Sequence, residues 1–447
     1  MNAIRKPVAR IRGGTNIPHF KNTAECESVK MPAPPLVVLP MRQHIGSPCK
    51  PTVKTGDMVA AGQTVGDSNA LVSAPIHATV SGRVRAIAPF LLPDGVEVEA
   101  VHIENDGYNT LHPEIRKPKV KNREDFLHAV RQSGIVGMGG AGFPTHAKLA
   151  LKKGASVDTL IINGAECEPY VTADYREIME NHANVLAGIE LVMEYMGIGN
   201  CVIGVESNKP KAVSLLAEGI AKKGMKGRVS VAVLPARYPY GAEKMLVRVA
   251  TGRTIPPGGL PSDVGVVVLN VSTVSALNCY LNTGMPLIHK RVTVDGRAVA
   301  NPKNVIVPIG APIRDIVDFC GGFSREPEKV IKGGPMMGAA QCDRQAPILK
   351  QDNAILCLTA DETFMAKAKP CIRCGRCVQT CPMSLAPMRL DRYASGNNVK
   401  MLRKLGITSC MECGCCAYAC PSKRPLVQSM RQGKQTERKG EMQKCST

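Results

Sequence analysis

The chain has 447 residues, enough for about three domains that each bury a core of their own. Its 57 Lys and Arg residues outnumber its 37 Asp and Glu residues, so the net charge of +20 favours anionic partners. Aromatic residues make up only 4% and tryptophan is absent, which leaves few platforms for stacking bases and argues against nucleic-acid binding. With 18 cysteines and no apolar run near the ~20 residues of a membrane span, we expect a soluble or peripheral protein that carries metal clusters.

A β-rich segment, residues 31–108, follows a basic and irregular stretch over residues 1–30. Within it, VKTGDMVAAGQTVGD and SAPIHATVSGRVRAI alternate short apolar strands with glycine-containing turns. Together they resemble the barrel-sandwich domain of biotinyl and lipoyl carrier proteins. Lys50 and Lys54 lie outside any carrier hairpin tip, so we expect a structural β domain.

Residues 124–290 alternate strands and helices, which predicts an α/β domain with a largely parallel sheet. The expected strands are VDTLIIN, NCVIGVES, RVSVAVLP and VGVVVLNV, and the expected helices are DYREIMENHANVLAGIELVMEYM and PKAVSLLAEGIAKK. The loop GMGGAGFPTHAK, residues 137–148, satisfies G-x-G-x-x-G. A dinucleotide fingerprint needs a strand before the glycines, whereas a helix with Asn122 as its N-cap is expected there. The spacing alone therefore does not indicate a Rossmann site.

Three further segments complete the chain. Residues 291–350 hold two strands, a Pro-Lys-Asn turn and a short helix, which suits a small β-grasp domain. Residues 351–425 are dominated by cysteine and predict a helical two-cluster ferredoxin-like domain. Residues 426–447 have an excess of Lys and Arg over Glu. That excess predicts either a segment that binds anionic surfaces or a solvated, disordered tail.

The cysteines of residues 351–425 form two repeats, CIRCGRCVQTCP and CMECGCCAYACP. Each has the spacing C-x2-C-x2-C-x3-C-P of two-cluster ferredoxins, in which the fourth cysteine of one repeat ligates the cluster of the other repeat. The first-repeat cluster is therefore expected to be a [4Fe-4S] cluster held by Cys371, Cys374, Cys377 and Cys420. The second-repeat cluster is expected to be held by Cys410, Cys413, Cys416 and Cys381.

Zinc is the alternative metal for these cysteines. Structural zinc sites use paired C-x2-C knuckles rather than a triple run that ends in Cys-Pro, so the spacing disfavours zinc. Cys415 is an extra thiol inside the second repeat, and we expect it not to be a ligand.

Four motifs in chain order carry a resemblance to a known family, namely GGAGFPTHAK, INGAECEP, YPYGAEKMLVRVATGR and VVVLNVSTV. They resemble the flavin-bearing, NADH-binding subunit of respiratory complex I and its hydrogenase relatives. With the barrel-sandwich, the β-grasp, SLBB-like unit and the two-cluster ferredoxin, nearly the whole chain is similar to the C subunits of Rnf (Rsx) electron-transport complexes. The resemblance implies a multidomain fold of α/β and α+β type that binds FMN and two [4Fe-4S] clusters and uses NAD(H) as substrate.

The resemblance also implies which residues face the flavin and the nicotinamide nucleotide, although it assigns no catalytic residue. Glycines let backbone N–H groups approach the flavin, and Lys148 would neutralise its phosphate. The alternative is a solvated loop for Glu166 and Glu168, and a strand-end cap for Asn270. The full implied set is Gly139, Gly140, Gly142, Phe143, Thr145, Lys148, Asn163, Glu166, Glu168, Glu243, Lys244 and Asn270.

The function implied by the resemblance is that of a peripheral subunit of a membrane ferredoxin:NAD+ oxidoreductase at the cytoplasmic face of the inner membrane. A flavin couples the two-electron chemistry of NAD(H) to clusters that each accept one electron. The implied partners are the other Rnf subunits, which would couple electron transfer to ion translocation, and ferredoxin, bound directly or through another subunit. Two alternatives are a soluble NADH diaphorase and an electron-relay scaffold with a degenerate flavin site.

Overall fold

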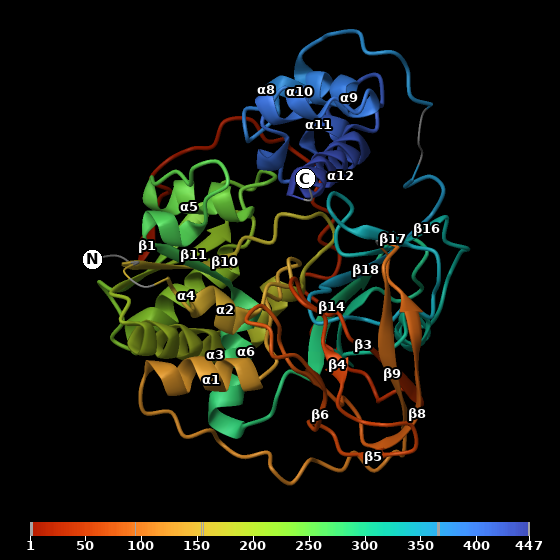
Figure 1. Ribbon diagram of the computed structural model, residues 1–447. Coiled ribbons are helices and arrows are strands. Elements are labelled where there is room, and N and C mark those ends of the chain that lie inside the picture. The colour runs from red at the N-terminus through yellow and green to blue at the C-terminus, as the bar shows by residue number, and fades with distance from the viewer. Residues whose placement is uncertain (1–2, 94, 153, 155, 364–366, 446–447) are drawn as a thin grey trace.

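The computed structural model describes residues 3–93, 95–152, 154, 156–363 and 367–445. Figure 1 shows an α/β domain on one side, two β domains on the other and a helical domain above them. This arrangement confirms the expected multidomain fold of α/β and α+β type. No helix in the described ranges is both long enough and apolar enough to cross a membrane.

A five-stranded parallel sheet, in the order β1-β12-β11-β10-β13, is the centre of the α/β domain. Its strands are β1 (Ile4–Arg5), β10 (Thr159–Gly164), β11 (Asn200–Glu206), β12 (Val229–Leu234) and β13 (Val266–Asn270). The strands read as continuous apolar runs because helices cover both faces of the sheet. Leu160 and Ile162 face one hydrophobic core and Ile161 the other, as the two-residue period of a strand requires.

Helices α3 (Ala173–Met196), α4 (Pro210–Lys222) and α6 (Val271–Thr283) contribute to the core on one face of this sheet. Helix α5 (Glu243–Thr251) covers the opposite face. Helix α1 (Arg123–Gln132) begins after Asn122, whose side chain accepts a hydrogen bond from the Asp125 backbone N–H, so the expected N-cap is confirmed. The remaining short helices of the domain are α2 (Thr145–Leu149) and the 3-10 turn η1 (Pro261–Val264).

The barrel-sandwich domain is built from two small antiparallel sheets (Figure 1). The first has the order β3-β9-β8-β5, with bounds Leu36–Pro40, Glu97–Asn105, Gly82–Leu91 and Met58–Val59. The second has the order β4-β6-β7, with bounds Lys50–Pro51, Thr64–Asp67 and Ile76–His77. The expected alternation of short strands and tight turns is confirmed.

The β-grasp sheet has the order β17-β16-β18-β14-β15-β2 and packs against α7 (Ile313–Phe319). Its strands are β2 (Val29–Lys30), β14 (His289–Asp295), β15 (Lys303–Pro308), β16 (Lys329–Lys332), β17 (Ala339–Gln341) and β18 (Ala354–Leu358). β18 follows the boundary expected at residue 350, yet it pairs with both β14 and β16. The sheet therefore extends into the segment that the sequence had assigned to the ferredoxin-like domain.

The described part of the ferredoxin-like domain is built from five short helical segments and one long helix, α12. These are α8 (Arg376–Gln379), α9 (Pro387–Ser395), α10 (Val399–Lys404), η2 (Ile407–Ser409), α11 (Cys415–Tyr418) and α12 (Leu426–Cys445). Met430 of α12 is buried with Leu390 and Leu402, and Glu437 of α12 pairs with Arg403. The disordered tail considered for residues 426–447 is therefore wrong for α12, whose side chains are described as far as Arg438, and residues 446–447 lie outside the described ranges.

The N-terminal strap, residues 11–17, ties the α/β domain to the ferredoxin-like domain. Thr15 and Tyr238 exchange two backbone hydrogen bonds of 2.8 and 3.1 Å. The neighbouring Gly14 donates its N–H to the carbonyl of Thr380 at 2.9 Å. Gly13 lies so close to the backbone that a Cβ there would be 2.8 Å from Cys381. The strap therefore fixes the distance between a loop of the parallel sheet and the end of the first cysteine repeat.

Candidate flavin, nucleotide and cluster sites

The candidate flavin site lies at the carboxyl edge of the parallel sheet. The chain runs from β10 to β11 and β12, and then returns to place β13 on the other side of β10. Loops diverge at such a reversal of strand order, and ligands of open parallel sheets bind in the resulting crevice. Asn163 at the end of β10 is the register partner of Asn270 at the end of β13. The INGAECEP and VVVLNVSTV motifs therefore meet at this crevice.

Asn270 connects the motifs of this crevice. Its Oδ1 accepts hydrogen bonds from the backbone N–H groups of Ser272 and Thr273 at 2.9 and 3.3 Å, so it is the N-cap of α6. Its Nδ2 donates to Asp174 Oδ2 at 2.6 Å and to the Asn163 carbonyl at 3.5 Å. Burial raises the pKa of Asp174, while its hydrogen bonds from Ser272 and Asn270 act in the opposite direction. The strand-end role considered for Asn270 is thus present, and a role in flavin binding stays a prediction.

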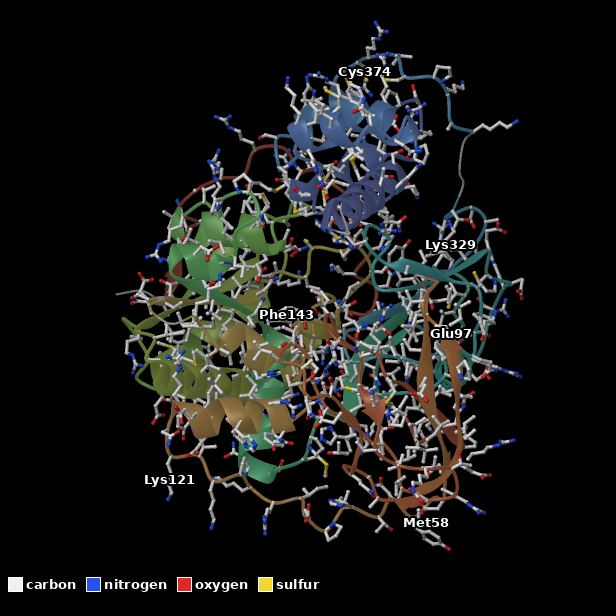
Figure 2. All side chains as sticks on the ribbon, viewed as in Figure 1. Met58, Glu97, Lys121, Phe143, Lys329 and Cys374 are labelled. Atoms are coloured by element: carbon white, nitrogen blue, oxygen red, sulfur yellow. The ribbon has the colours of Figure 1, made fainter. Side chains whose placement is uncertain are left out.

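The glycine loop is a closed turn with an exposed tip. Gly137 donates its N–H to the Phe143 carbonyl at 2.8 Å, and Gly142 donates its N–H to the Gly137 carbonyl at 3.1 Å. Gly140 and Gly142 have φ angles of +112° and +66°, which a residue with a Cβ adopts only with strain. No atom lies within 4 Å of the position that a Cβ on Gly140 would take. The tip therefore leaves its backbone open to a ligand, near the middle of the molecule, where Figure 2 labels Phe143.

Three residues support this loop. The Lys290 Nζ of β14 donates to the Met138 carbonyl at 2.8 Å, and the Met138 N–H donates to Thr273 Oγ1 at 3.0 Å. A Cβ on Gly139 would lie 3.1 Å from Asn270 Nδ2. Burial lowers the pKa of Lys290 to about 8. The sequence analysis missed Lys290 and Thr273. Lys290 is the last residue of the expected α/β domain and proves to belong to β14 of the β-grasp sheet, and Thr273 resembles any residue in the first turn of a helix.

Lys148 and Glu243, predicted from different motifs, form an ion pair of 2.5 Å across the site. The same Nζ donates to the Val268 carbonyl at 3.0 Å. Lys244 follows Glu243 in the first turn of α5 and is half-buried. The structure therefore brings the expected cationic group to the carboxyl edge of the sheet, but with a carboxylate as its present partner.

Glu166 is not in a solvated loop, because its side chain turns toward the start of α3. Its two carboxylate oxygens accept hydrogen bonds from the backbone N–H groups of Asp174 and Tyr175 at 2.7 and 3.3 Å. The Lys21 Nζ donates a hydrogen bond to the Glu166 carbonyl at 2.9 Å. The Lys209 Nζ donates one to the Ala165 carbonyl at 2.7 Å. Burial raises the pKa of Glu166 to about 7 against the opposing effect of the two lysines. Glu166 therefore caps the start of α3, a structural role that its motif had not indicated.

Glu168 points the other way, toward the β-grasp domain. Its Oε2 accepts a hydrogen bond from the Met336 backbone N–H at 3.0 Å, whereas its Oε1 is buried without a partner. Burial raises the pKa of Glu168 to about 7. A solvated loop is excluded for this residue too.

The residues at the crevice fit a phosphate-bearing ligand such as FMN, because the glycine tip leaves its backbone open and Lys148 supplies a cation. Thr145 Oγ1 and Glu168 Oε1, both in the predicted set, are buried side-chain atoms with no hydrogen-bond partner. Gln351 Oε1 is a third, and its side chain lies 3.3 Å from the Cβ position of Gly142. Buried polar atoms are normally hydrogen-bonded, so the unpaired Thr145 and Gln351 atoms beside the glycine loop are consistent with a bound polar molecule. Glu168 lies apart from this loop, against Met336.

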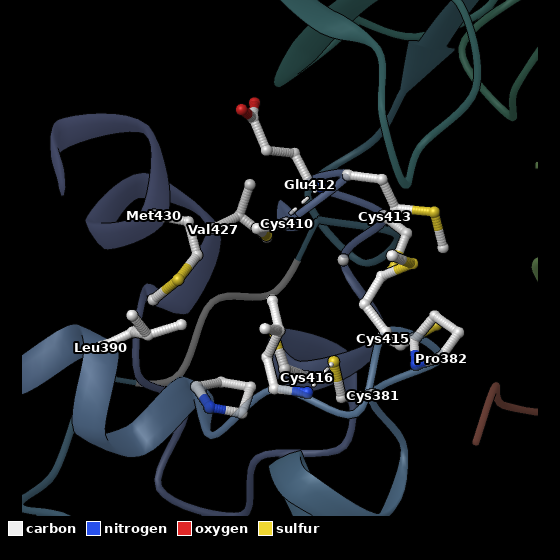
Figure 3. A pocket seen from close by; sticks show the side chains of 15 residues that line it. Cys381, Pro382, Leu390, Cys410, Glu412, Cys413, Cys415, Cys416, Val427 and Met430 are labelled. Atoms are coloured by element: carbon white, nitrogen blue, oxygen red, sulfur yellow. Dashed lines mark hydrogen bonds between the residues drawn. The ribbon is translucent and has the colours of Figure 1, made fainter. Parts of the chain in front are cut away.

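The second cysteine repeat surrounds a small pocket (Figure 3). Cys410, Cys413 and Cys416 line it together with Cys381 from the end of the first repeat. Burial, followed by the charges of the other three thiols, raises the pKa of Cys416 to about 12. Cys381 of the first repeat thus lies together with the thiols of the second repeat, and the ligand assignment stays a prediction. Cys415, expected not to be a ligand, also lines the pocket.

The first repeat is more open to solvent. Cys371 and Cys374 are exposed, and Figure 2 places Cys374 at the end of the molecule remote from the barrel-sandwich. Asp391 raises the pKa of Arg424, and the thiols of Cys371 and Cys420 add to that effect, so both cysteines lie near one guanidinium. Among the described residues no group of three or more His, Cys, Asp or Glu side chains is arranged to hold a single metal ion.

Family models match the chain in four consecutive segments. The RnfC barrel sandwich hybrid domain matches residues 9–108, and the Nuo51 FMN-binding domain matches residues 130–278. An SLBB domain matches residues 291–340, and a 4Fe-4S dicluster domain matches residues 370–424. These matches confirm the domain order, the flavin-binding domain and the iron–sulfur clusters, and they leave zinc without support.

Curated relatives resemble the chain over most of its length. The C subunit of a proton-translocating ferredoxin:NAD(+) oxidoreductase complex from Clostridium ljungdahlii is 45% identical over 85% of this chain and 83% of its own. The C subunit of a Na(+)-translocating ferredoxin:NAD(+) oxidoreductase complex from Acetobacterium woodii is 42% identical over 95% and 96%. The C subunit of an ion-translocating oxidoreductase complex from Rhodobacter capsulatus is 41% identical over 96% and 83%.

Among solved structures, a chain of an NAD+-reducing [NiFe]-hydrogenase in the H2-reduced state resembles this fold with a TM-score of 0.50 and 18% identity. The match covers 71% of this chain and 62% of that one. At this identity the likeness concerns the fold alone.

Proposed function

Because this chain belongs to the family of C subunits of ion-translocating ferredoxin:NAD(+) oxidoreductase complexes, we propose that it is the subunit that exchanges electrons with NAD(H). When bound, FMN accepts or donates a hydride at the nicotinamide and exchanges single electrons with iron–sulfur clusters. The chain's own part is to hold the flavin at the glycine tip, to position the nucleotide above it and to seat the clusters at a fixed distance.

The observation that carries this proposal is the direct packing of the flavin-side loop on the second cysteine repeat. Cys167, within INGAECEP, packs against a buried group that contains Cys413. Met336 lies between the two sites, because its N–H binds Glu168 and its side chain approaches Gly414, where an added Cβ would be 3.1 Å away. A two-electron site and a one-electron site in such contact suit the conversion of hydride chemistry into single-electron transfer.

The solvent exposure of the two repeats supports an order in which electrons pass through the two clusters. The second repeat faces the flavin-side loop, so its cluster is the immediate exchange partner of the flavin. Cys371 and Cys374 of the first repeat are exposed, so the first-repeat cluster faces the neighbouring subunits or ferredoxin. We assign the whole subunit to the cytoplasmic side of the inner membrane, where NAD(H) is available, held there by the other subunits of the complex.

Affinity purification of the full chain from solubilised membranes tests this proposal. We expect FMN, iron and membrane-spanning partner subunits in the purified complex. Full turnover with a physiological acceptor in membrane-free extract would overturn it in favour of a soluble diaphorase. Protein that retains its iron but never contains FMN would overturn it in favour of an electron-relay scaffold.

A further inference from the structure

Tyr238 carries a buried hydroxyl that nothing in the described part of the chain satisfies. It lies in the loop between β12 and α5, and its side chain is only 3% exposed. Its hydroxyl oxygen is shielded from solvent and has no hydrogen-bond partner. A buried hydroxyl without a partner costs stability, so a native structure that keeps one usually has a ligand, a water or a functional reason for it.

The surroundings of Tyr238 are rich in sulfur. Tyr238 forms one buried group with Cys413 and Cys415, and Cys167, Met336 and Met411 pack against that group. A phenol hydroxyl can donate a hydrogen bond, and thiol and thiolate sulfurs can accept one. The Tyr238 hydroxyl is therefore a buried, unpaired donor packed beside sulfur acceptors.

The backbone holds Tyr238 against the second-repeat site. Thr15 of the N-terminal strap exchanges both of its backbone hydrogen bonds with Tyr238, and the adjacent Gly14 binds the Thr380 carbonyl beside Cys381. A Cβ on Gly14 would lie 2.6 Å from the Tyr238 carbonyl, so the strap and the loop are in tight contact. Backbone hydrogen bonds of the strap thus link the loop that carries Tyr238, in the flavin-binding domain, to the cluster domain.

We propose that the Tyr238 hydroxyl donates a hydrogen bond to a sulfur atom of the second-repeat cluster and raises the reduction potential of that cluster. The inference rests on the proposed cluster assignment. Hydrogen bonds to the sulfurs are among the factors that set iron–sulfur potentials, because they stabilise the more negative, reduced cluster. Glu168 Oε1 is the competing acceptor, since it too is buried without a partner, but the two groups are not bonded to each other.

Tyr238→Phe in the full, cluster-loaded chain is the test, because it removes the hydroxyl and keeps the ring. In an anaerobic redox titration followed by paramagnetic resonance, the ratio of reduced to oxidised second-repeat cluster should fall about tenfold at a fixed potential. For one electron this equals a lowering of about 59 mV. The first-repeat cluster and FMN should titrate as in the wild type. An unchanged second-repeat potential, with iron content and spectrum intact, would overturn the inference and leave the proposed function standing.

Tyr240→Phe is the matched control. Tyr240 lies two residues away and is also buried, but it packs in the core beneath α5 rather than with Cys413. We expect no shift of either cluster in this variant. If Tyr238→Phe does not load clusters, 3-fluorotyrosine at position 238 provides a second measurement, because a more acidic phenol should raise the potential. A wild-type chain that shows no second-repeat cluster signal at all would instead contradict the proposed ligand set.

Discussion

Removing the carboxylate of Glu166 should loosen the start of α3, because that carboxylate accepts the Asp174 and Tyr175 backbone N–H groups. Thr172, the N-cap residue by position, makes no side-chain cap hydrogen bond, so Glu166 takes over that role. Two hydrogen bonds at about 0.5–1.5 kcal/mol net each predict that Glu166→Ala destabilises the α/β domain by about 1–3 kcal/mol. A loss of ~2 kcal/mol would lower the melting temperature by about 4–8 °C in a domain of roughly 150–250 residues.

Glu166→Gln should behave differently, because it keeps one acceptor oxygen and the shape of the side chain. Burial raises the pKa of Glu166 from 4.5 to about 7, so the folded protein binds this proton more tightly than the unfolded chain does. The contribution of Glu166 to stability is therefore greatest below the unfolded pKa and declines as the pH rises toward about 7. Glutamine does not titrate, so the Gln variant should gain stability relative to the wild type between about pH 4.5 and pH 7.

Hydrogen exchange at residues 165–180, combined with urea unfolding at several pH values, measures both effects. Glu218→Ala, at an exposed position on α4, is the control for a lost carboxylate. Equal exchange at α3 in the Ala and Gln variants, with no pH-dependent difference from the wild type, would refute the capping role. Nucleotide titration adds a separate readout. A unit charge ~8 Å from the nucleotide is worth roughly 2 kcal/mol at an effective dielectric near 20, so tens-fold tighter NAD(H) binding to Glu166→Gln would support the nucleotide role implied by the resemblance.

Three other perturbations address the cofactor sites. Cys381→Ser should alter the paramagnetic resonance signal of the second-repeat cluster and leave the first-repeat signal intact, because Cys381 lines the second-repeat pocket. Damage confined to the first-repeat signal would show that each repeat holds its own cluster. Gly139→Ala should weaken FMN binding several-fold in a flavin fluorescence titration, with little loss of stability. The reason is that the new Cβ would lie 3.1 Å from the Asn270 side chain. An unchanged affinity would place the flavin away from this tip. Acid precipitation should release all FMN into the supernatant, since the chain has no S-G-A-T attachment motif for covalent flavin, and flavin retained in the pellet would contradict non-covalent binding.

The elements of the α/β domain were predictable because each strand is an apolar run and each helix has its own periodicity. The strand expected in VGVVVLNV is β13, and α6 begins directly after it, at the N-cap Asn270. The end of the β-grasp domain was not predictable in the same way. β18 is apolar but follows a change in composition, and only its pairing with β14 and β16 assigns it to that sheet.

The candidate site shows the same division. Cysteine spacing predicted that Cys381 would lie with Cys410, Cys413 and Cys416, because ligand spacing along the chain reflects the geometry of the loop around a cluster. The directions of Glu166 and Glu168 were not predictable, since they depend on the backbone of α3 and of the Met336 loop. Lys290 was missed for a related reason, because its contact with Met138 depends on how β14 of the β-grasp sheet packs beside the glycine loop.

The N-terminal strap has a consequence for how the protein is made. Its backbone bonds join Gly14 to Thr380 and Thr15 to Tyr238, so residues synthesised first wait for a partner near the end of translation. Thr380 adjoins Cys381, so the strap can complete its contacts only after the first cysteine repeat has been synthesised and folded. Closure of the strap is therefore a late step in the folding of the chain, although its residues are the first to be synthesised.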